Sequence, residues 1–280
     1  MDKIKKVYID SRYKTNDSVS NSDFKFELKE ALDLPDNTVC YIDDICIPHT
    51  WYTIEEYNNK LYVENTYPDL SLSASVLSLP EGNYNATSLA ATLQSTFQNS
   101  FPNENYRCVY NTTRGSITIT SDRDFRIFTD QQVITINNTL IGDPSFPGWV
   151  DNNNQLTTVD INNLRSMNEI LRHSVPILSD PSFETGFIDL LNVHNIYIHC
   201  GNIGNYNCIG VRGDNPIKKV PVSSSFGYLI LDSVVAPHDK IDVSRQSIKS
   251  LNFTLKNVHG NVINLHGAHI SLSLIFQTIG

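Results

Sequence analysis

The sequence predicts an all-β fold: a jelly roll, which is an antiparallel β-sandwich, with an inserted or elaborated segment that contains one short helix. Three observations support this. Apolar and polar residues alternate with a period of two over long segments, as in residues 247–280. Helical periodicity is clear at one place, near residue 85. Strands do not alternate with helices, so a parallel α/β sheet is not expected.

Short strands follow one another in the first 80 residues. Phe24, Phe26 and Leu28 alternate with lysine and glutamate, which indicates a strand with one buried face. Leu-Pro-Asp-Asn at 34–37 then separates this strand from the next one. The other strands expected here are 6–11, 60–65 and 71–80.

The single expected helix follows these strands. Leu89, Leu93 and Phe97 recur at i, i+4 and i+8, so they share one helix face. Asn85 is a suitable N-cap because its side chain can accept a hydrogen bond from a backbone N–H of the first turn.

Further β structure is expected beyond the helix. A hairpin joins 106–111 to 116–122 through Thr113-Arg114-Gly115. Weaker strands are expected at 125–128 and 131–137, a long loop at 141–163, a short helix or turn at 168–174, and further strands at 187–200, 218–222 and 226–234. We therefore assign 1–80 and 185–280 to the jelly-roll core and 81–184 to an insertion or elaborated loops, although strands between 71 and 137 could belong to the main sandwich.

The C-terminal segment supplies two long strands. Leu251, Phe253 and Leu255 point to one side of the first strand. The turn at 258–261 contains Gly260, which tolerates a positive φ. The residues that share a face of the second run are Ala268, Ile270, Leu272, Leu274 and Phe276.

Charge disfavours nucleic acid as the main partner. The formal net charge is −9 and the isoelectric point is about 5.3, whereas phosphate backbones attract basic surfaces. Residues 218–280 are mildly basic, with six Lys or Arg against three Asp. No apolar run approaches 18 residues, so no membrane span is expected, and the first 13 residues lack the apolar core of a cleaved signal.

Cysteine and histidine residues do not form a recognisable metal motif. The cysteines number five, without zinc-ribbon spacing, and are expected to be reduced and mostly buried, as in a protein assembled in the cytoplasm or nucleus. Two groups contain possible metal ligands, but we expect ordinary strand and turn residues in both. They are His194, His199, Cys200 and Cys208, and His259, His266 and His269. We expect no metal and no cofactor.

No enzymatic activity is expected either. Asp43 and Asp44 beside Glu55 and Glu56 are candidates for paired acid–base carboxylates, but nothing in the sequence brings the two pairs together. No serine lies in a G-x-S-x-G elbow, and the glycines at 201–210 lack the context of a phosphate-binding loop.

Several phrases, taken in order, resemble one family. They are "VYIDSRYKTNDSVSNSDFKFEL", "DDICIPHTWYTI", "LPEGNYNATSLAATLQ", "IYIHCGNIGNYN", "IKKVPVSSSFGYLILDSVVAPHDKIDVS" and "IKSLNFTLKNVHGNVINLHGAHISLSLIF". Together they look like the penton, or minor capsid, proteins of Polinton or Maverick elements, adintoviruses and related virophages. The resemblance covers nearly the whole chain and is weakest at 125–165.

The resemblance implies a jelly-roll subunit that forms homopentamers at the five-fold vertices of an icosahedral virion. It implies contact with a double-jelly-roll major capsid protein, and pentons can also carry parts that bind a host receptor. A ring requires two different patches on each subunit. The expected interface residues are Lys218, Lys219, Pro237, His238 and Asp239.

Two rival functions remain open at this point. One is a receptor- or carbohydrate-binding β-sandwich of a virion, which loop aromatics such as Tyr57, Tyr67, Tyr84 and Tyr206 would support. The other is a hydrolase on a β fold, acting through the carboxylates named above. Trp51 would be either a partner anchor or, more simply, a core aromatic at a strand end.

Overall fold

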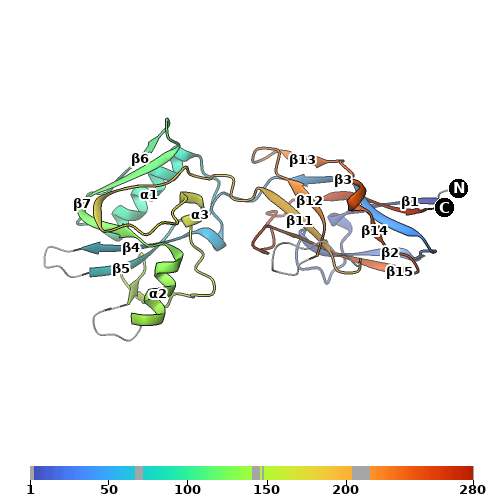
Figure 1. Ribbon diagram of the computed structural model, residues 1–280, viewed down its shortest axis with the longest axis horizontal. Coiled ribbons are helices and arrows are strands. Elements are labelled where there is room, and N and C mark those ends of the chain that lie inside the picture. The colour runs from blue at the N-terminus through green and yellow to red at the C-terminus, as the bar shows by residue number, and fades with distance from the viewer. Residues whose placement is uncertain (1–2, 67–71, 141–145, 147, 204–214, 280) are drawn as a thin grey trace. The chain divides into compact units, whose positions relative to one another are not determined.

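The chain forms two compact units in the computed structural model (Figure 1). The structure describes residues 3–66, 72–140, 146, 148–203 and 215–279. One unit, here called the jelly-roll unit, consists of Met1–Trp51 and Val193–Gly280. The other, here called the inserted unit, is Tyr52–Asn192. The chain therefore leaves the first unit once, builds the second and returns.

The first sheet of the jelly-roll unit contains both ends of the chain. Within the described residues its order is β1-β16-β3-β13, and β14 also pairs with β3. Its strands are β1 (Lys3–Asp10), β3 (Thr38–Pro48), β13 (Leu229–Asp232), β14 (Ile241–Asp242) and β16 (Ser271–Thr278). All of these pairs are antiparallel.

The second sheet of this unit has the order β12-β11-β15-β2 in the described part of the chain, again antiparallel throughout. Its strands are β2 (Asp23–Asp33), β11 (Asn195–Cys200), β12 (Pro216–Pro221) and β15 (Ser247–Lys256). The chain passes from one sheet to the other at β1–β2, β2–β3, β3–β11, β12–β13, β14–β15 and β15–β16. This crossing pattern over two packed sheets is a jelly roll, as predicted.

The hydrophobic core of the jelly-roll unit lies between its two sheets. Phe24 on β2 stacks on Phe253 on β15 with 5.4 Å between ring centroids. Leu272, Leu274 and Phe276 on β16 supply buried side chains from the facing sheet. The two C-terminal runs thus bury their apolar faces as expected. They do so in opposite sheets and not as a hairpin, while Gly260 takes the left-handed φ of 85° in a local turn after β15.

The inserted unit is a mixed sheet covered by helices. Its order in the described residues is β10-β7-β4-β5-β8-β9, with β6 also paired to β7. The strands are β4 (Lys60–Thr66), β5 (Leu72–Ser78), β6 (Arg107–Asn111), β7 (Ser116–Ile127), β8 (Trp149–Val150), β9 (Leu156–Thr157) and β10 (Asp180–Glu184). The strand expected at 125–128 is not separate, because residues 125–127 are the last part of β7.

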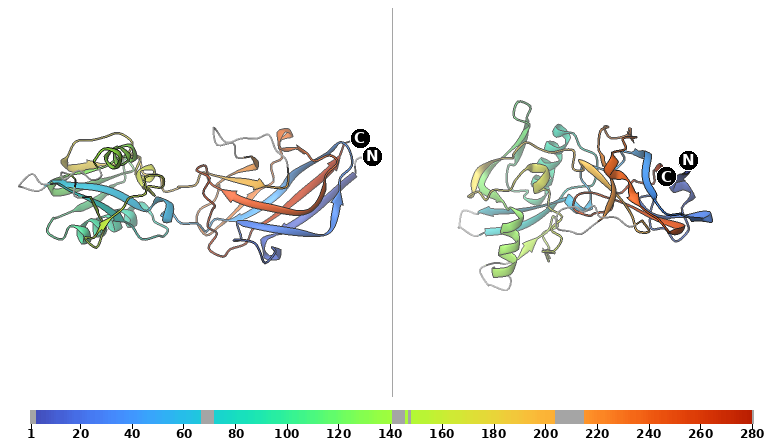
Figure 2. Two further views of the ribbon diagram at one scale, coloured as in Figure 1. Left: turned by 90° about the horizontal axis from the view of Figure 1, so that it is seen from below. Right: turned by 45° about the vertical axis from the view of Figure 1, so that its right-hand side comes forward.

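Both faces of this sheet are buried, each under a different helix (Figure 2). On β4, Leu61 and Val63 point into a cluster with α1 (Ala86–Ser100). The intervening Tyr62 points to the other side, where α2 (Asp130–Leu140) contributes Val133. Alternation along a strand therefore supplies two separate cores.

The helix near residue 85 is confirmed, together with its cap. The Asn85 side chain accepts a hydrogen bond from the Ser88 N–H at 2.8 Å, and the Ser88 hydroxyl accepts one from the Asn85 N–H at 3.0 Å. Leu89, Leu93 and Phe97 are fully buried on one face. The short helix expected at 168–174 is α3 (Asn168–Leu171).

The strand expected at 131–137 is wrong, because these residues form α2. Thr129 and Gln132 make a capping box: the Gln132 side chain accepts from the Thr129 N–H at 2.9 Å, and the Thr129 hydroxyl accepts from the Gln132 N–H at 3.3 Å. Val133 and Asn137, one turn apart, are both buried. The β-branched composition of this segment indicated a strand, but the cap and the tertiary contacts outweigh that preference.

The boundary between the units also differs from the expected one. Residues 52–80 and 185–192 were assigned to the jelly roll, yet they lie in the inserted unit. The reason is strand pairing, since β4 pairs with β5 and β7 rather than with either sheet of the sandwich. The strand expected at 187–200 is also shorter than expected. Only β11 (Asn195–Cys200) is a strand there, and residues up to Asn192 belong to the inserted unit.

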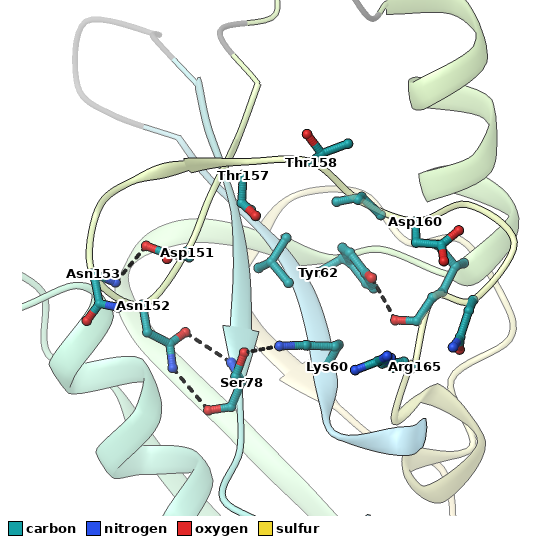
Figure 3. Close-up of a pocket in the computed structure, with 14 residues that line it drawn as sticks. Lys60, Tyr62, Ser78, Asp151, Asn152, Asn153, Thr157, Thr158, Asp160 and Arg165 are labelled. Atoms are coloured by element: carbon teal, nitrogen blue, oxygen red, sulfur yellow. Dashed lines mark hydrogen bonds between the residues drawn. The ribbon is translucent and has the colours of Figure 1, made fainter. Parts of the chain in front are cut away.

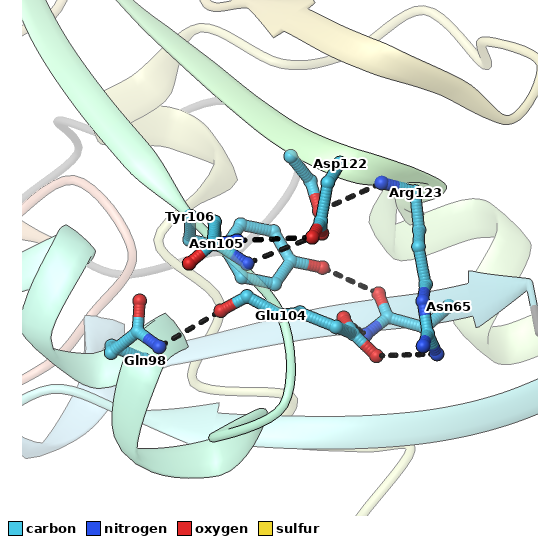
Figure 4. A network of polar contacts seen from close by, with 8 residues as sticks. Asn65, Gln98, Glu104, Asn105, Tyr106, Asp122 and Arg123 are labelled. Carbon is cyan, nitrogen blue, oxygen red and sulfur yellow. Dashed lines mark hydrogen bonds and ion pairs between the residues drawn. The ribbon is translucent and has the colours of Figure 1, made fainter.

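A buried polar network lies beside α1 in the inserted unit (Figure 4). The Glu104 carboxylate accepts a hydrogen bond from the Asn65 amide at 2.6 Å and lies 3.5 Å from the Arg123 guanidinium. The Tyr106 hydroxyl donates to the other side of the Asn65 amide at 2.6 Å. Burial raises the pKa of Glu104 above its usual range, since desolvation disfavours its charged form.

We expect the inserted unit to fold by itself. Its two ends are already held together, because the Asn192 side chain donates to the backbone oxygens of Tyr52 and Thr53 at 2.9 and 3.0 Å. A fragment of residues 52–192 should unfold cooperatively in urea and give dispersed amide resonances in NMR. The matched control is a fragment of residues 81–184, which lacks β4 and β5 and should be unfolded. An unfolded 52–192 fragment would contradict this division.

The inserted unit should lose stability in mild acid through His173, its single histidine. The ring is buried, its Nε2–H donates to the Ile127 oxygen at 2.9 Å, and desolvation holds the pKa of His173 below its usual value. Between that folded pKa and about 6.5, the unfolded chain binds a proton that the folded chain does not, so stability falls as pH falls.

The measurement is the urea midpoint of the 52–192 fragment at pH 7.5 and pH 5. The midpoint should drop towards pH 5, and the drop should be smaller in His173→Gln, in which an amide can donate the same hydrogen bond. Comparing the two proteins cancels the contribution of Glu104, whose raised pKa acts in the opposite direction. Identical pH profiles would refute the role of His173.

Candidate interaction surface

An exposed apolar strip runs along the last strand of the first jelly-roll sheet. Ile230 on β13 points into the core and is fully buried, so its neighbours Leu229 and Leu231 point outward. Leu231 is 70% exposed, and Val234 just beyond the strand is 74% exposed. We call the set Phe226, Tyr228, Leu229, Leu231 and Val234 the β13 strip.

A tight turn presents the aromatic end of the β13 strip. The Tyr228 N–H donates to the Ser225 oxygen at 3.1 Å, and Gly227 takes a φ of 84°, a conformation that favours glycine. The turn is pinned to the end of β3, where the His49 N–H donates to the Tyr228 oxygen at 2.9 Å. Phe226 and Tyr228 therefore project from a fixed backbone.

His49 and Trp51 support this turn from beneath. The His49 ring donates from Nδ1 to the Ser224 oxygen at 2.8 Å, stacks on Trp51 at 4.2 Å and meets the edge of Phe226 at 6.1 Å. Desolvation lowers the pKa of His49, so the neutral ring is favoured. Trp51 is buried and is a core aromatic rather than an exposed anchor.

The expected interface residue Lys218 is instead buried between the sheets, which is a correction. Its side chain is 3% exposed; its Nζ donates to the Val234 oxygen at 2.7 Å and lies 3.6 Å from the Asp232 carboxylate. Adjacent residues of a strand point to opposite sides, so Lys218 and Lys219 on β12 cannot both face outward. Lys219 is the exposed member of the pair.

The segment after β13 is held by aspartate side chains. Asp232 accepts from the Val234 N–H at 2.8 Å, and Asp239 accepts from the Ala236 N–H at 3.0 Å. Pro237–Asp239 form a single turn of 3-10 helix, in which Pro237 and His238 are exposed and Asp239 is half-buried. This turn is thus accessible just beyond the β13 strip, whereas Lys219 is exposed on the outer face of the second sheet.

A second apolar strip lies on the opposite edge of the same sheet. The register runs from Leu231 through Cys46 and Ser271 to Asp10, so the outer sides of β13 and β1 lie on one face. On β1 this face carries the exposed side chains of Ile4 and Tyr8. We call Ile4, Tyr8 and the nearby exposed Tyr13 the β1 strip.

The carboxylates considered for acid–base chemistry do not form a pair. Asp43 and Asp44 bind Lys6 of β1, whose Nζ lies 2.7 and 3.2 Å from them. Glu55 belongs to the inserted unit, where it accepts a hydrogen bond from the Tyr52 N–H at 2.7 Å. Each carboxylate thus has a structural hydrogen-bonding role within its own unit.

The described residues contain neither a metal-binding cluster nor a membrane-spanning helix. Among the described residues, no group of three His, Cys, Asp or Glu is placed to hold a metal ion. Cys208, considered as a ligand, lies outside the described residues. No helix in the described ranges is long and apolar enough to cross a membrane.

Sequence reasoning placed a strand at 226–234 but missed that its outer residues form an apolar surface. The sequence Leu-Ile-Leu at 229–231 could have indicated this surface, because both faces of one short strand are apolar there. On a central strand this indicates burial on both sides. On a strand at the end of a sheet, one of the two faces remains exposed.

Comparison with known proteins identifies the fold. No protein-family model and no curated protein matches the chain. The structure is similar to the crystal structure of the mavirus penton protein, with a TM-score of 0.50 and 10% sequence identity over 100% of both chains. A chain of the Sputnik virophage structure has a TM-score of 0.43 and 11% identity, covering 99% of this chain and 98% of that one. The chain therefore has the fold of the mavirus penton protein, and the resemblance inferred from the sequence is confirmed at the level of the fold.

Replacing Lys218 by Met should destabilise the jelly-roll unit, because it leaves the Asp232 carboxylate buried without its counter-charge. Losing one partner of a buried ion pair costs about 3–5 kcal/mol, and Asp232 keeps its backbone donor, so we expect about 3 kcal/mol. The control is Lys219→Met on the exposed side, expected to change the unfolding free energy by less than about 0.5 kcal/mol. Urea unfolding measures both, and equal effects would show that the buried pair is unimportant.

Proposed function

We propose that this chain is a structural capsid subunit, a penton that forms homopentamers at the five-fold vertices of an icosahedral virion. Three independent features support this: the order of its sequence motifs, its jelly-roll fold, and the exposed apolar strip on β13. The strip is the observation that carries the proposal, since large exposed apolar side chains grouped on one edge mark a surface that a partner covers.

The arrangement of the two strips suits a ring. A closed ring uses a heterologous interface, in which two different patches of each subunit meet. The β13 strip and the β1 strip are different patches on opposite edges of one sheet. An edge strand with exposed backbone groups and apolar side chains would otherwise invite uncontrolled pairing. We therefore assign the β13 strip to one side of the subunit contact and the β1 strip to the other.

Other parts of the proposal follow from this role. Lys219, Pro237, His238 and Asp239 would lie at the rim of the contact, where polar residues are usual. A double-jelly-roll major capsid protein would surround the pentamer, and the protein would reside in the virion after assembly in the host cytoplasm or nucleus. The origin would be a Polinton, adintovirus or virophage genome. The role needs no catalysis, cofactor or direct contact with nucleic acid.

The experiment measures solution mass by light scattering on a sizing column. The unmodified chain should give a closed species of five times 31.5 kDa. Leu231→Asp should give a 31.5 kDa monomer, because a carboxylate would be buried in the contact without a partner. The matched control is Leu178→Asp, which changes a leucine of the inserted unit that is even more exposed, at 86%, and should leave the pentamer intact.

Two outcomes would overturn the assignment. A pentamer that survives Leu231→Asp would place the contact elsewhere. An unmodified chain that stays monomeric even when co-expressed with a major capsid protein would remove the vertex role.

Receptor or carbohydrate binding is the second candidate. The loop aromatics expected to support it do not, because Tyr57 and Tyr84 are half-buried and the Tyr84 hydroxyl donates to the Pro80 oxygen at 2.8 Å. Tyr67 and Tyr206 lie outside the described residues. The observation that favours this function is instead a polar cavity in the inserted unit.

A further inference from the structure

The inserted unit contains a cavity of about 530 Å³ beside the start of β4 (Figure 3). This volume is within the range of small-molecule sites. The floor comes from β4 and β5 through Lys60, Tyr62 and Ser78, and the wall comes from two loops on either side of β9. Every residue that lines the cavity belongs to the inserted unit.

Two cationic residues, Lys60 and Arg165, line this cavity. The Lys60 ammonium is half-buried, and its one hydrogen bond in the described structure is to the Ser78 hydroxyl at 2.6 Å. No carboxylate of the described residues lies within 4 Å of it. The Arg165 guanidinium forms an ion pair with Glu56. Burial lowers the pKa of Lys60, and the charge of Arg165 adds to this, whereas the carboxylates of Asp151 and Glu56 act in the opposite direction.

Backbone hydrogen bonds hold the two residues that carry these cations side by side. The Lys60 N–H donates to the Arg165 oxygen at 2.8 Å, and the Met167 N–H donates to the Lys60 oxygen at 2.9 Å. Met167 is fully buried and anchors the segment. Arg165 has a left-handed φ of 51°, which is unusual for a residue with a side chain and clusters at functional sites. An anionic group bound here would meet a preorganised pair of donors.

The rest of the lining is polar but not basic. The Thr157 hydroxyl points into the cavity, and Asp151 and Asp160 lie along its wall (Figure 3). Asp151 accepts from the N–H groups of Asn153 and Gln155 at 2.8 and 2.9 Å, which lowers the pKa of its carboxyl. The two aspartates offer acceptors to hydroxyl groups. A ligand that is anionic all round, such as a polyphosphate, would be repelled by them.

The cavity also has an apolar side. Tyr62 and Val76 line it, and the Tyr62 ring is fixed because its hydroxyl donates to the Leu164 oxygen at 2.7 Å. A fitting ligand therefore combines one anionic group for the cations, several hydroxyls for the threonine and aspartates, and a C–H face for the apolar side. A sugar ring bearing a carboxylate has all three.

We propose that this cavity binds an acidic monosaccharide unit, with the sugar carboxylate between Lys60 and Arg165. The site would give the particle an attachment point for acidic glycans. It goes beyond the vertex role and does not depend on it, since a pentamer can form whether or not the cavity is filled.

The test is saturation-transfer NMR on the full chain with two probes, glucuronic acid and glucose, and with inorganic sulfate as a competitor. Glucuronic acid and glucose differ by the carboxylate, so saturable transfer to glucuronic acid should be at least fivefold stronger than transfer to glucose. Lys60→Gln and Arg165→Gln should each reduce it at least fivefold. The control Arg114→Gln removes an exposed arginine of the same unit and should change nothing.

Each other outcome overturns the proposal. Equal transfer in Lys60→Gln, with thermal unfolding by circular dichroism showing a folded protein, would place binding elsewhere. Sulfate that displaces glucuronic acid, together with equal transfer to both sugars, would indicate a bare-anion site. No saturable transfer to glucuronic acid would show an inert cavity. All three readouts are independent of the mass measurement that tests the vertex role.

Discussion

The buried contact of Lys218 with Asp232 fixes the edge of the sandwich on which the proposed assembly depends. An ammonium enclosed between two sheets is stable only with its acceptors in place, here the Asp232 carboxylate and the Val234 oxygen. Because Lys218 lies on β12 and Asp232 on β13, the pair joins the two sheets. With Asp232 and Ile230 turned inward, Leu229 and Leu231 must point outward. The exposed strip is therefore a consequence of the buried pair.

The jelly-roll unit and the inserted unit each have their own hydrophobic core, so the proposed assembly contact and the proposed ligand site lie in separate units. The jelly-roll unit closes its own core between two sheets, and the inserted unit has two cores of its own, one under each face of its sheet. Asn192 holds the ends of the insertion together, so the sandwich receives it between β3 and β11 without giving up a strand. Such an insertion can change its cavity while the apolar strips of the jelly-roll unit stay constant. The proposed glycan site and the proposed ring contact are thus separate in their physical basis.

Of the contact residues predicted from the sequence, the structure corrects one and leaves the others as predictions. Lys219, Pro237 and His238 are exposed, and their role in a contact stays a prediction. Lys218 was assigned to the surface from its charge, whereas its position in β12 turns it into the core. The cavity of the inserted unit was missed entirely, because Lys60 and Arg165 are 105 residues apart and meet only through the pairing of residues 165–167 with the start of β4.

The sequence by itself determined the local structure that depends on neighbours in the chain. The period-two alternation at 247–280, the Asn85 cap and the turn at Gly260 each follow from residues a few positions apart. Tertiary structure alone decided which sheet each strand joined and where the insertion began. Together with the local Thr129–Gln132 cap, tertiary contacts also made a helix of residues 131–137. The sheet that a strand joins and the start of the insertion depend on contacts between residues distant in sequence. An apolar face can be buried against any apolar partner, so its partner is determined only by the complete fold.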